Sequence, residues 1–323
     1  MKRSIAWFAC ITGCVAAAGP AWAAEPWPSK AVTVIVPFPA GGGTDAFMRP
    51  LAQQLSAQLG QSVVVDNRGG AGGTVGAAIA ARAVPDGYTF FVGGAHHAIA
   101  PSFYKGLTYD IEKDFVPVTL IAQPPQIIVA APAAPFSDLK GLVAAARSQP
   151  GKFNFGSAGN GTSHHLAGEL FKLQAGVDLT HVPYTGAGPM LLALMGSQVD
   201  LAFDGLGSSA QHIRGGKVKP IAVAAPARSS AFPDVPTAAE AGLPGYEVST
   251  WYAMWAPKGT PAPVVERMYA EVRKALEKPE IKKVWLSNGS EVPSYTSAEF
   301  GTYLHNEVER WAKVAKDAGI KAD

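Results

Sequence analysis

Two glycine-rich segments have the residue types and the order that bind a small anion through the backbone. In the first, a β-branched run ending at Val36 leads through Pro37-Phe38-Pro39-Ala40-Gly41-Gly42-Gly43 to Thr44-Asp45. In the second, a run ending at Ser157 leads through Ala158-Gly159-Asn160-Gly161 to Thr162. Each order predicts a strand, a tight loop and a helix N-terminus, where unpaired N–H groups and the helix dipole attract negative charge. An ordinary strand-to-helix turn is the alternative for either segment.

Polar side chains near these segments are further candidates for ligand contact. Histidines stand in adjacent pairs at 96 and 97 and at 164 and 165. Neighbouring side chains diverge on a helix or strand, so a shared metal ion is not indicated, and we predict no metal. One histidine of each pair can still reach a cleft as a neutral donor, and His97 is our candidate. The alternative is a solvent-exposed loop histidine.

Asp204 and Tyr184 follow apolar runs that predict strands. Because open α/β sheets bind ligands at the carboxyl ends of their strands, both are candidate ligand-binding residues. For Asp204 the alternative is an N-cap of the helix that follows it.

Motifs of enzymes and cofactor sites are incomplete in this sequence. Phe155-Gly156-Ser157-Ala158-Gly159 lacks the first glycine of the nucleophile elbow, so Ser157 is a poor candidate for a hydrolase nucleophile. The phosphate-binding motif G-x-x-x-x-G-K-[ST] is absent, and Val75 stands where a dinucleotide fingerprint needs its third glycine. We therefore predict no catalytic residues and no cofactor.

The elements that position these residues alternate between strands and helices. Residues 32–36, 63–65 and 88–92 have strand patterns, and an apolar residue recurs every fourth position from Phe47 to Leu59 on a helix. This alternation predicts α/β units with parallel sheets covered on both faces. Pro50 falls inside the helix that starts at Thr44, so we expect an irregular first turn.

Two proline-containing segments, 122–126 and 225–227, look like crossings between units. Two crossings predict a middle domain inserted into a discontinuous outer one, with a hinge between them. We therefore expect one lobe from residues 24–123 and 227–323, and a second lobe from residues 124–226.

The N-terminal residues predict export. Lys2 and Arg3, the apolar run 5–18 and Ala21-Trp22-Ala23 fit a signal peptide of residues 1–23. The alternative is a lipoprotein cleavage box ending at Cys14. Removing Lys2 and Arg3 from 27 basic residues leaves 25, equal to the 25 acidic ones, so nucleic-acid binding is not indicated. The mature chain has no cysteine, and we expect a periplasmic location.

Many short segments, in order along the mature chain, resemble one family, the Bug (TctC-type) extracytoplasmic solute receptors of tripartite tricarboxylate transporters. Those segments include Trp27-Pro28, Pro37-Phe38-Pro39-Ala40-Gly41-Gly42, Asp66-Asn67-Arg68, Gly70-Ala71-Gly72-Gly73, Pro85-Asp86-Gly87-Tyr88-Thr89, Ser157-Ala158-Gly159-Asn160-Gly161-Thr162-Ser163, Val182-Pro183-Tyr184 and Pro233-Asp234-Val235-Pro236-Thr237.

The resemblance implies a type II periplasmic binding-protein fold, in which two α/β lobes joined by a two-strand hinge close on a small carboxylate. It implies delivery to two membrane-embedded transporter subunits by a monomer. In the first lobe it implies ligand contact by Phe38, Ala40, Gly41, Gly42, Thr44 and Asp45. In the second lobe it implies contact by Ser157, Thr162 and Ser163.

This sequence departs from the family pattern at four places. Thr185 stands where a lysine is usual, Gly43 replaces proline or serine, Gly205-Leu206-Gly207 replaces Asn-Leu-Pro, and Pro50 is unexpected. We therefore expect a ligand preference different from the simplest dicarboxylates. The alternatives to a transport receptor are an exported α/β hydrolase using Ser157 and a receptor that serves a sensor protein.

Overall fold

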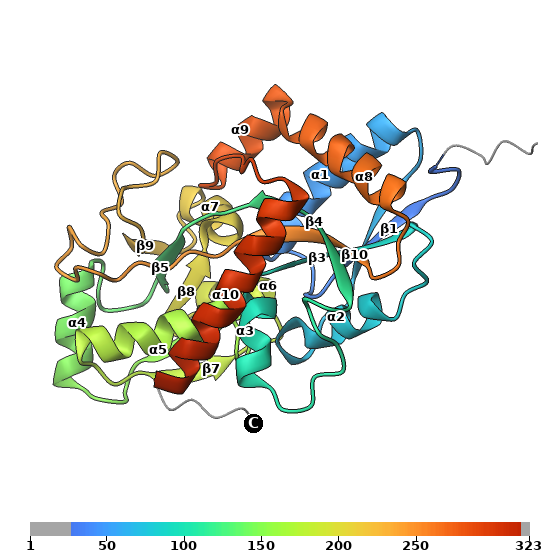
Figure 1. Cartoon of the computed structure of the whole chain (residues 1–323). Helices are drawn as coiled ribbons and strands as arrows, with labels where there is room; N and C mark the ends of the chain where they lie inside the picture. The colour runs from blue at the N-terminus through green and yellow to red at the C-terminus, as the bar shows by residue number, and fades with distance from the viewer. Residues whose placement is uncertain (1–26, 318–323) are drawn as a thin grey trace, which may run out of the picture.

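The computed structural model describes residues 27–317, which form two five-stranded sheets (Figure 1). The first sheet has the strand order β2-β1-β3-β10-β4. Its strands are β1 (Val32–Val36), β2 (Val63–Asn67), β3 (Thr89–Gly94), β4 (Phe115–Ala122) and β10 (Tyr252–Pro257). Because β10 comes from a distant part of the chain, this sheet belongs to a discontinuous unit.

The second sheet is built from one continuous stretch of chain. Its strand order is β7-β6-β8-β5-β9. Its strands are β5 (Gln126–Ala130), β6 (Asn154–Ser157), β7 (Thr180–Pro183), β8 (Leu201–Gly205) and β9 (Lys219–Val223). The prediction of two α/β units is confirmed, and the two strand orders support the proposal that the second unit is inserted into the first.

The prediction of purely parallel sheets is wrong. Strand β10 is antiparallel to β3 and β4, and β5 is antiparallel to β8 and β9. The reason is the direction in which the chain crosses between the lobes. Both β5 and β10 begin at a crossing, whereas their neighbours end at the cleft, so each crossing strand runs opposite to the strands beside it.

The two crossings lie side by side and form a hinge of paired backbone. The N–H of Gln126 donates to the carbonyl of Val248 at 3.0 Å, and the N–H of Thr250 donates to Pro124 at 3.2 Å. The segment before Val248 packs into the core of the second sheet through Phe232, Val235, Ala238 and Tyr246. We therefore propose that the second crossing lies at residues 248–250 and not at the predicted boundary of 226/227.

Helices cover both faces of the first sheet. One face packs against α1 (Gly43–Leu59), α8 (Ala262–Leu276) and α9 (Pro279–Ser287). The other packs against α2 (Thr74–Ala81), α3 (Ala95–Phe103) and α10 (Ser297–Asp317), where α10 lies along α3 (Figure 1). A short 3₁₀ turn, η1 (Ala71–Gly73), precedes α2. The helices α3 and α9 were not predicted from the sequence.

The second sheet carries its own helices and its own core. They are α4 (Leu139–Ser148), α5 (Ser163–Ala175), α6 (Ala187–Met195) and α7 (Leu206–Arg214). Within residues 27–317, no helix is long and apolar enough to cross a membrane.

Helix α1 is intact at its start, although Pro50 lies inside it. The N–H of Ala46 donates to the carbonyl of Gly42 at 3.0 Å, so the first turn is closed. The prediction of an irregular first turn is therefore wrong. Proline has no N–H, so Pro50 lacks the hydrogen bond to the carbonyl of residue 46. That bond belongs to the second turn, so the first turn is unaffected.

Candidate functional site

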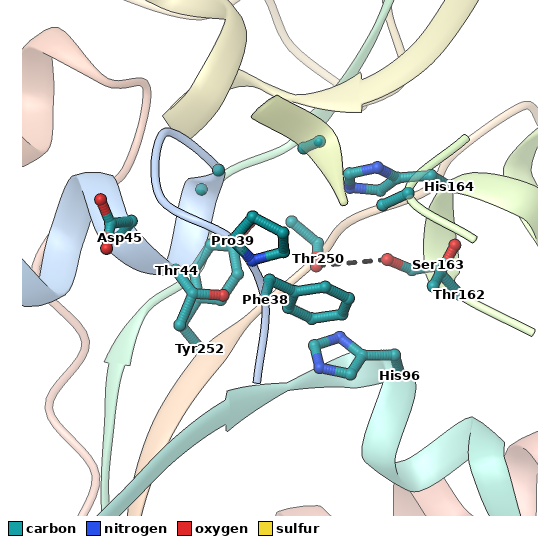
Figure 2. A pocket seen from close by; sticks show the side chains of 14 residues that line it. Phe38, Pro39, Thr44, Asp45, His96, Thr162, Ser163, His164, Thr250 and Tyr252 are labelled. Carbon is teal, nitrogen blue, oxygen red and sulfur yellow. Dashed lines mark hydrogen bonds between the residues drawn. The ribbon is translucent and has the colours of Figure 1, made fainter. Parts of the chain in front are cut away.

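A cavity lies between the two lobes, at the carboxyl ends of their strands (Figure 2). Both lobes and the hinge contribute walls: Phe38, Pro39, Gly42, Gly43, Thr44, Asp45, His96, Ala158, Thr162, Ser163, His164, Ala187, Thr250 and Tyr252. In this arrangement the space is about 20 Å³, room for about one water molecule. The lobes must therefore open for a ligand to enter.

The first-lobe wall is the N-terminus of α1. Its N-cap is Gly42, which has no side chain to accept from the first-turn N–H groups. The N–H groups of Gly43 and Thr44 have no carbonyl one turn earlier, so they point outward from the helix. Both residues line the cavity. This end of α1 can donate hydrogen bonds to a carboxylate.

The second-lobe wall is the N-terminus of α5. Thr162 is the N-cap, and its hydroxyl donates to the carbonyl of Gly159 at 2.7 Å while it accepts from the N–H of His165 at 3.4 Å. The hydroxyl of Ser163 lies 3.4 Å from that of Thr250 on the hinge. Thr162 and Ser163, both predicted, are thus brought to the cavity opposite α1.

Asp45 lines the cavity but is occupied by other donors. Its carboxylate accepts from the N–H of Gly41 at 3.2 Å, from Arg49 at 2.6 Å and from Asn67 at 3.2 Å. These bonds fix the loop 37–43. Gly41 needs its backbone freedom, since its φ is +87°. Ala40 and Gly41 were predicted as ligand contacts, but they lie on the loop outside the cavity wall.

In each histidine pair, the first member lines the cavity and the second accepts a hydrogen bond from the backbone. His96 lines the cavity under the ring of Phe38, with the ring centroids 4.6 Å apart. His97 points away from it: its Nδ1 accepts from the N–H of Gly94 at 3.2 Å, and its Nε2 lies 3.4 Å from the carbonyl of Gly73. The prediction of His97 as a cavity residue is wrong, because its ring caps the start of α3.

In the second lobe, His164 lines the cavity and His165 turns back. The Nδ1 of His165 accepts from the N–H of Gly161 at 3.2 Å, and its ring stacks on His181 at 4.0 Å between centroids. One histidine of each pair, His96 and His164, thus lines the cavity.

Burial keeps these histidines neutral. It lowers the pKa of His97 to about 4 and that of His181 to about 3, the latter helped by His165. Burial also lowers the pKa of His96 and of His164, although the Asp204 carboxylate partly opposes the change at His164.

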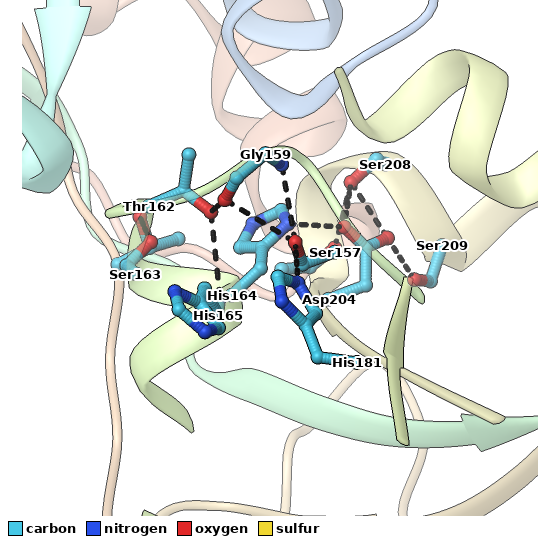
Figure 3. A network of polar contacts seen from close by, with 12 residues as sticks. Ser157, Gly159, Thr162, Ser163, His164, His165, His181, Asp204, Ser208 and Ser209 are labelled. Atoms are coloured by element: carbon cyan, nitrogen blue, oxygen red, sulfur yellow. Dashed lines mark hydrogen bonds and ion pairs between the residues drawn. The ribbon is translucent and has the colours of Figure 1, made fainter. Parts of the chain in front are cut away.

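Three other predicted residues do not line the cavity, and two of them, Ser157 and Asp204, belong to a polar network of the second lobe (Figure 3). The fully buried Ser157 hydroxyl contacts Nε2 of His181 at 2.7 Å and accepts from the N–H of Gly159 at 3.1 Å. Asp204 accepts from the hydroxyls of Ser208 and Ser209 and lies behind His164, at 3.5 Å between Oδ1 and Nδ1. It is not the helix N-cap either, since that is Gly205. Tyr184 lies in the outer groove with Gly72 and Asn160.

The second crossing and the first residue of β10 supply two wall residues that the sequence did not indicate, Thr250 and Tyr252. A Cβ on Gly43 would lie 2.0 Å from the Tyr252 hydroxyl, so this tyrosine takes the space of a side chain at position 43. Gly43, where the sequence departs from the family pattern, is thus in contact with Tyr252, a residue more than 200 positions away. No local pattern could have revealed that pairing.

The lobes meet along a seam of small residues. A Cβ on Gly188 would lie 2.7 Å from the carbonyl oxygen of Ala40 on the opposite lobe, and one on Gly72 would lie 2.7 Å from that of Asn160. The Tyr104 hydroxyl also donates to the carbonyl of Asn160 at 2.5 Å across the same seam. Closure as seen here requires glycine at these contacts. Within the described residues, no cluster of three or more His, Cys, Asp or Glu side chains could hold a metal ion.

Comparisons with known proteins agree on one family. A family model described as the tripartite tricarboxylate transporter family receptor matches residues 47–320. A Pseudomonas sp. (strain P51) protein from the tcbD-tcbE intergenic region is 39% identical over 93% of this chain and 89% of its own.

Two of the solved structures that are similar to this chain contain a carboxylate. An R. palustris protein solved with adipate is 36% identical with a TM-score of 0.89, covering 92% of this chain and all of its own. MatC of Rhodopseudomonas palustris, solved with malate, is 36% identical with a TM-score of 0.84, covering 89% of this chain and 99% of its own. The two-lobed fold expected from the sequence is that of these proteins.

We predict that Gly188→Ala weakens closure of the lobes. The added methyl meets a backbone oxygen, and overpacking of this kind costs about 1–3 kcal/mol, which lowers the ratio of closed to open protein roughly 5- to 150-fold. Small-angle scattering should give a larger radius of gyration for this variant than for wild type. Gly301→Ala is the matched control, since its Cβ would meet Pro117 at an ordinary 3.6 Å within one lobe. Equal radii for all three proteins would contradict the prediction.

We also predict that stability falls as the pH drops from about 7 to about 4. The pKa of His97 is about 4 in the folded chain and about 6.5 when unfolded, so the unfolded chain binds an extra proton in this window. His97 alone then contributes a loss of roughly 3 kcal/mol, measured by urea unfolding across the range. His97→Asn keeps an acceptor for Gly94 but does not titrate. Its free energy of unfolding should therefore fall less steeply with pH than that of the wild-type protein. If the free energy of unfolding of the variant falls with pH as steeply as that of the wild-type protein, His97 does not cause this pH dependence.

Proposed function

Because the chain belongs to the tripartite tricarboxylate transporter receptor family, we propose that it captures a small carboxylated metabolite between its lobes and delivers it to that transporter. The relatives solved with adipate and malate support a carboxylate as ligand. Neither relative identifies the ligand of this chain, because the walls around the far end of a ligand differ between proteins.

One observation carries the proposal: two helix N-termini from opposite lobes face the same cavity. The first-turn N–H groups of α1 have no side-chain cap, and those of α5 lie across from them. Within residues 27–317 no lysine or arginine lines this cavity. A carboxylate would therefore be held by backbone donors and helix dipoles, which suits a chain whose mature form is formally neutral.

Binding would act through the hinge. A ligand that contacts both walls stabilises the closed arrangement over the open one, and the difference in affinity sets how far the equilibrium shifts. The contact between Ala40 and Gly188 joins opposite lobes in this arrangement, so it would break as the lobes separate. The surface of the closed form is what the transporter would recognise.

We further propose export to the periplasm, action as a monomer, and docking to two membrane-embedded subunits. The predicted signal peptide and Cys14 lie outside the described residues. A receptor that serves a sensor protein would bind its ligand in the same way and differ only in its membrane partner.

The geometry gives no support to a hydrolase. The Ser157 hydroxyl has the hydrogen bond to a histidine that a nucleophile needs, but it is fully buried and does not line the cavity. A bound ligand in the cavity would not meet it. Turnover that is lost in Ser157→Ala would revive this alternative.

We predict that Thr44→Pro weakens carboxylate binding more than Thr44→Val does. Proline fits the first turn of a helix but removes the N–H, whereas valine keeps the N–H and removes only the hydroxyl. A lost hydrogen bond to a charged group costs about 1.5–3 kcal/mol, or roughly 10- to 150-fold in Kd. Isothermal titration with a panel of carboxylates, chosen first by thermal shift of the wild-type protein, measures the difference.

Two outcomes would contradict the proposal. One is a wild-type protein that no carboxylate stabilises at saturating concentration, since a ligand that binds only the folded state must raise its Tm. The other is a pair of Thr44 variants with equal affinity, which would show that the N–H of residue 44 makes no contact.

A further inference from the structure

Two asparagines of this chain, Asn160 and Asn288, are followed by glycine. Glycine has no side chain to shield its backbone nitrogen, so the side chain of an asparagine before it can react with that nitrogen and lose its amide. The two dipeptides have different surroundings. Asn160 lies in the loop before α5, whereas Asn288 lies at the end of α9.

The peptide group between Asn160 and Gly161 has a base at its nitrogen. The N–H of Gly161 donates to Nδ1 of His165 at 3.2 Å. Burial lowers the pKa of His165, while Glu169 opposes the change and Lys172 adds to it, so the ring is neutral at neutral pH. Oε1 of Glu169 lies 4.0 Å from Nε2 of this ring. A carboxylate there favours the tautomer with the proton on Nε2, which leaves Nδ1 as the acceptor.

The same peptide group has a donor at its oxygen. The hydroxyl of Tyr104 donates to the carbonyl of Asn160 at 2.5 Å. When the nitrogen of a peptide group loses its proton, negative charge develops on the oxygen, and a donor placed there stabilises it. Tyr104 belongs to the first lobe and Asn160 to the second, so this contact would break as the lobes separate. Both ends of the peptide group are therefore activated in the closed arrangement.

The side chain that would react is exposed. Asn160 lies on the surface, and within residues 27–317 its side-chain amide makes no hydrogen bond. Gly161 has a φ of +66°, which favours glycine, and a Cβ there would lie 2.8 Å from the ring of Phe103. The fold thus requires glycine after Asn160.

The second dipeptide has no such arrangement. The N–H of Gly289 donates to the carbonyl of Leu286 at 3.0 Å, and the N–H of Asn288 donates to the carbonyls of the preceding helical turn. A carbonyl accepts a hydrogen bond but is too weak a base to take the proton. Asn288 is therefore an internal comparison for Asn160.

We propose that Asn160 is a site of spontaneous deamidation, with His165 as the base and Tyr104 as the donor that stabilises the ionised peptide group. The nitrogen of Gly161 forms a bond to Cγ of Asn160, and the bond from Cγ to the amide nitrogen breaks to release ammonia. The proton of Gly161 passes to His165 and from there to the departing nitrogen. Water then opens the cyclic imide to aspartate, or to isoaspartate, in which the backbone runs through the former side chain.

The product carries a negative charge in the loop before α5, whose N-terminus faces the cavity. This charge would oppose the entry of a carboxylate, a consequence that rests on the proposed function. The deamidation itself depends only on the loop and on the contact with Tyr104.

Peptide mapping by mass spectrometry, on purified mature protein kept folded at neutral pH, measures conversion at both asparagines in one sample. We expect Asn160 to convert roughly tenfold or more faster than Asn288, because a positioned general base contributes about 10²-fold or more. In His165→Phe, which keeps a ring against His181, the rate at Asn160 should fall roughly tenfold or more.

Two further variants complete the test. In Tyr104→Phe the rate at Asn160 should fall roughly 2- to 10-fold, as expected for the loss of one hydrogen bond. His212→Phe, on α7 and away from this loop, is the matched control and should keep the wild-type rate. The rate at Asn288 should be the same in all of these proteins, with folding verified by Tm.

Two results would overturn the proposal. One is conversion at Asn288 that equals or exceeds conversion at Asn160 in the folded wild-type protein, which needs no variant to be measured. The other is a folded His165→Phe protein in which Asn160 converts as fast as in wild type, since the imidazole would then not act as the base.

Discussion

The structure depends on backbone N–H groups that start helices at a shared cleft. The first turn of any helix has donors without intrahelical partners, and here the N-caps of α1, α3, α6 and α7 are the glycines 42, 94, 186 and 205. A glycine cap leaves those donors to the solvent, to a neighbouring side chain or to a ligand. Because strand-to-helix loops gather at the carboxyl edge of each sheet, the uncapped ends of both lobes meet. The proposed anion site therefore needs no lysine or arginine among the residues that line the cavity.

The histidine pairs show how one helix start serves two purposes. The second member of each pair folds back onto the backbone, where His97 accepts from Gly94 and His165 from Gly161. The first member is then carried into the cavity, since adjacent residues on a helix point about 100° apart. Burial keeps all of these rings neutral, so the cavity gains hydrogen-bonding groups without gaining charge.

Closure and topology are linked through the hinge. Strand β10 enters the first sheet antiparallel because it returns from the second lobe. The crossing that leads into it carries Thr250, and its first residue is Tyr252, and both line the cavity. This one stretch of chain therefore joins the lobes, completes a sheet and lines the site. Small residues at the seam allow the backbones to approach within contact distance, so the closed form is defined by steric fit between Gly188 and Ala40.

The sequence by itself determined the α/β alternation, the inserted unit and the two glycine loops, because each rests on a periodicity or a motif spanning a few neighbouring residues. It also placed Thr44, Thr162 and Ser163 correctly at helix starts that face the cavity. Only the tertiary structure decided the direction of the strands, the placement of His96 and not His97 at the cavity, and the absence of Ser157 and Asp204 from its wall. Those outcomes depend on what a side chain meets across the fold, such as the Tyr252 hydroxyl against Gly43, and contacts between distant residues leave no trace in local pattern.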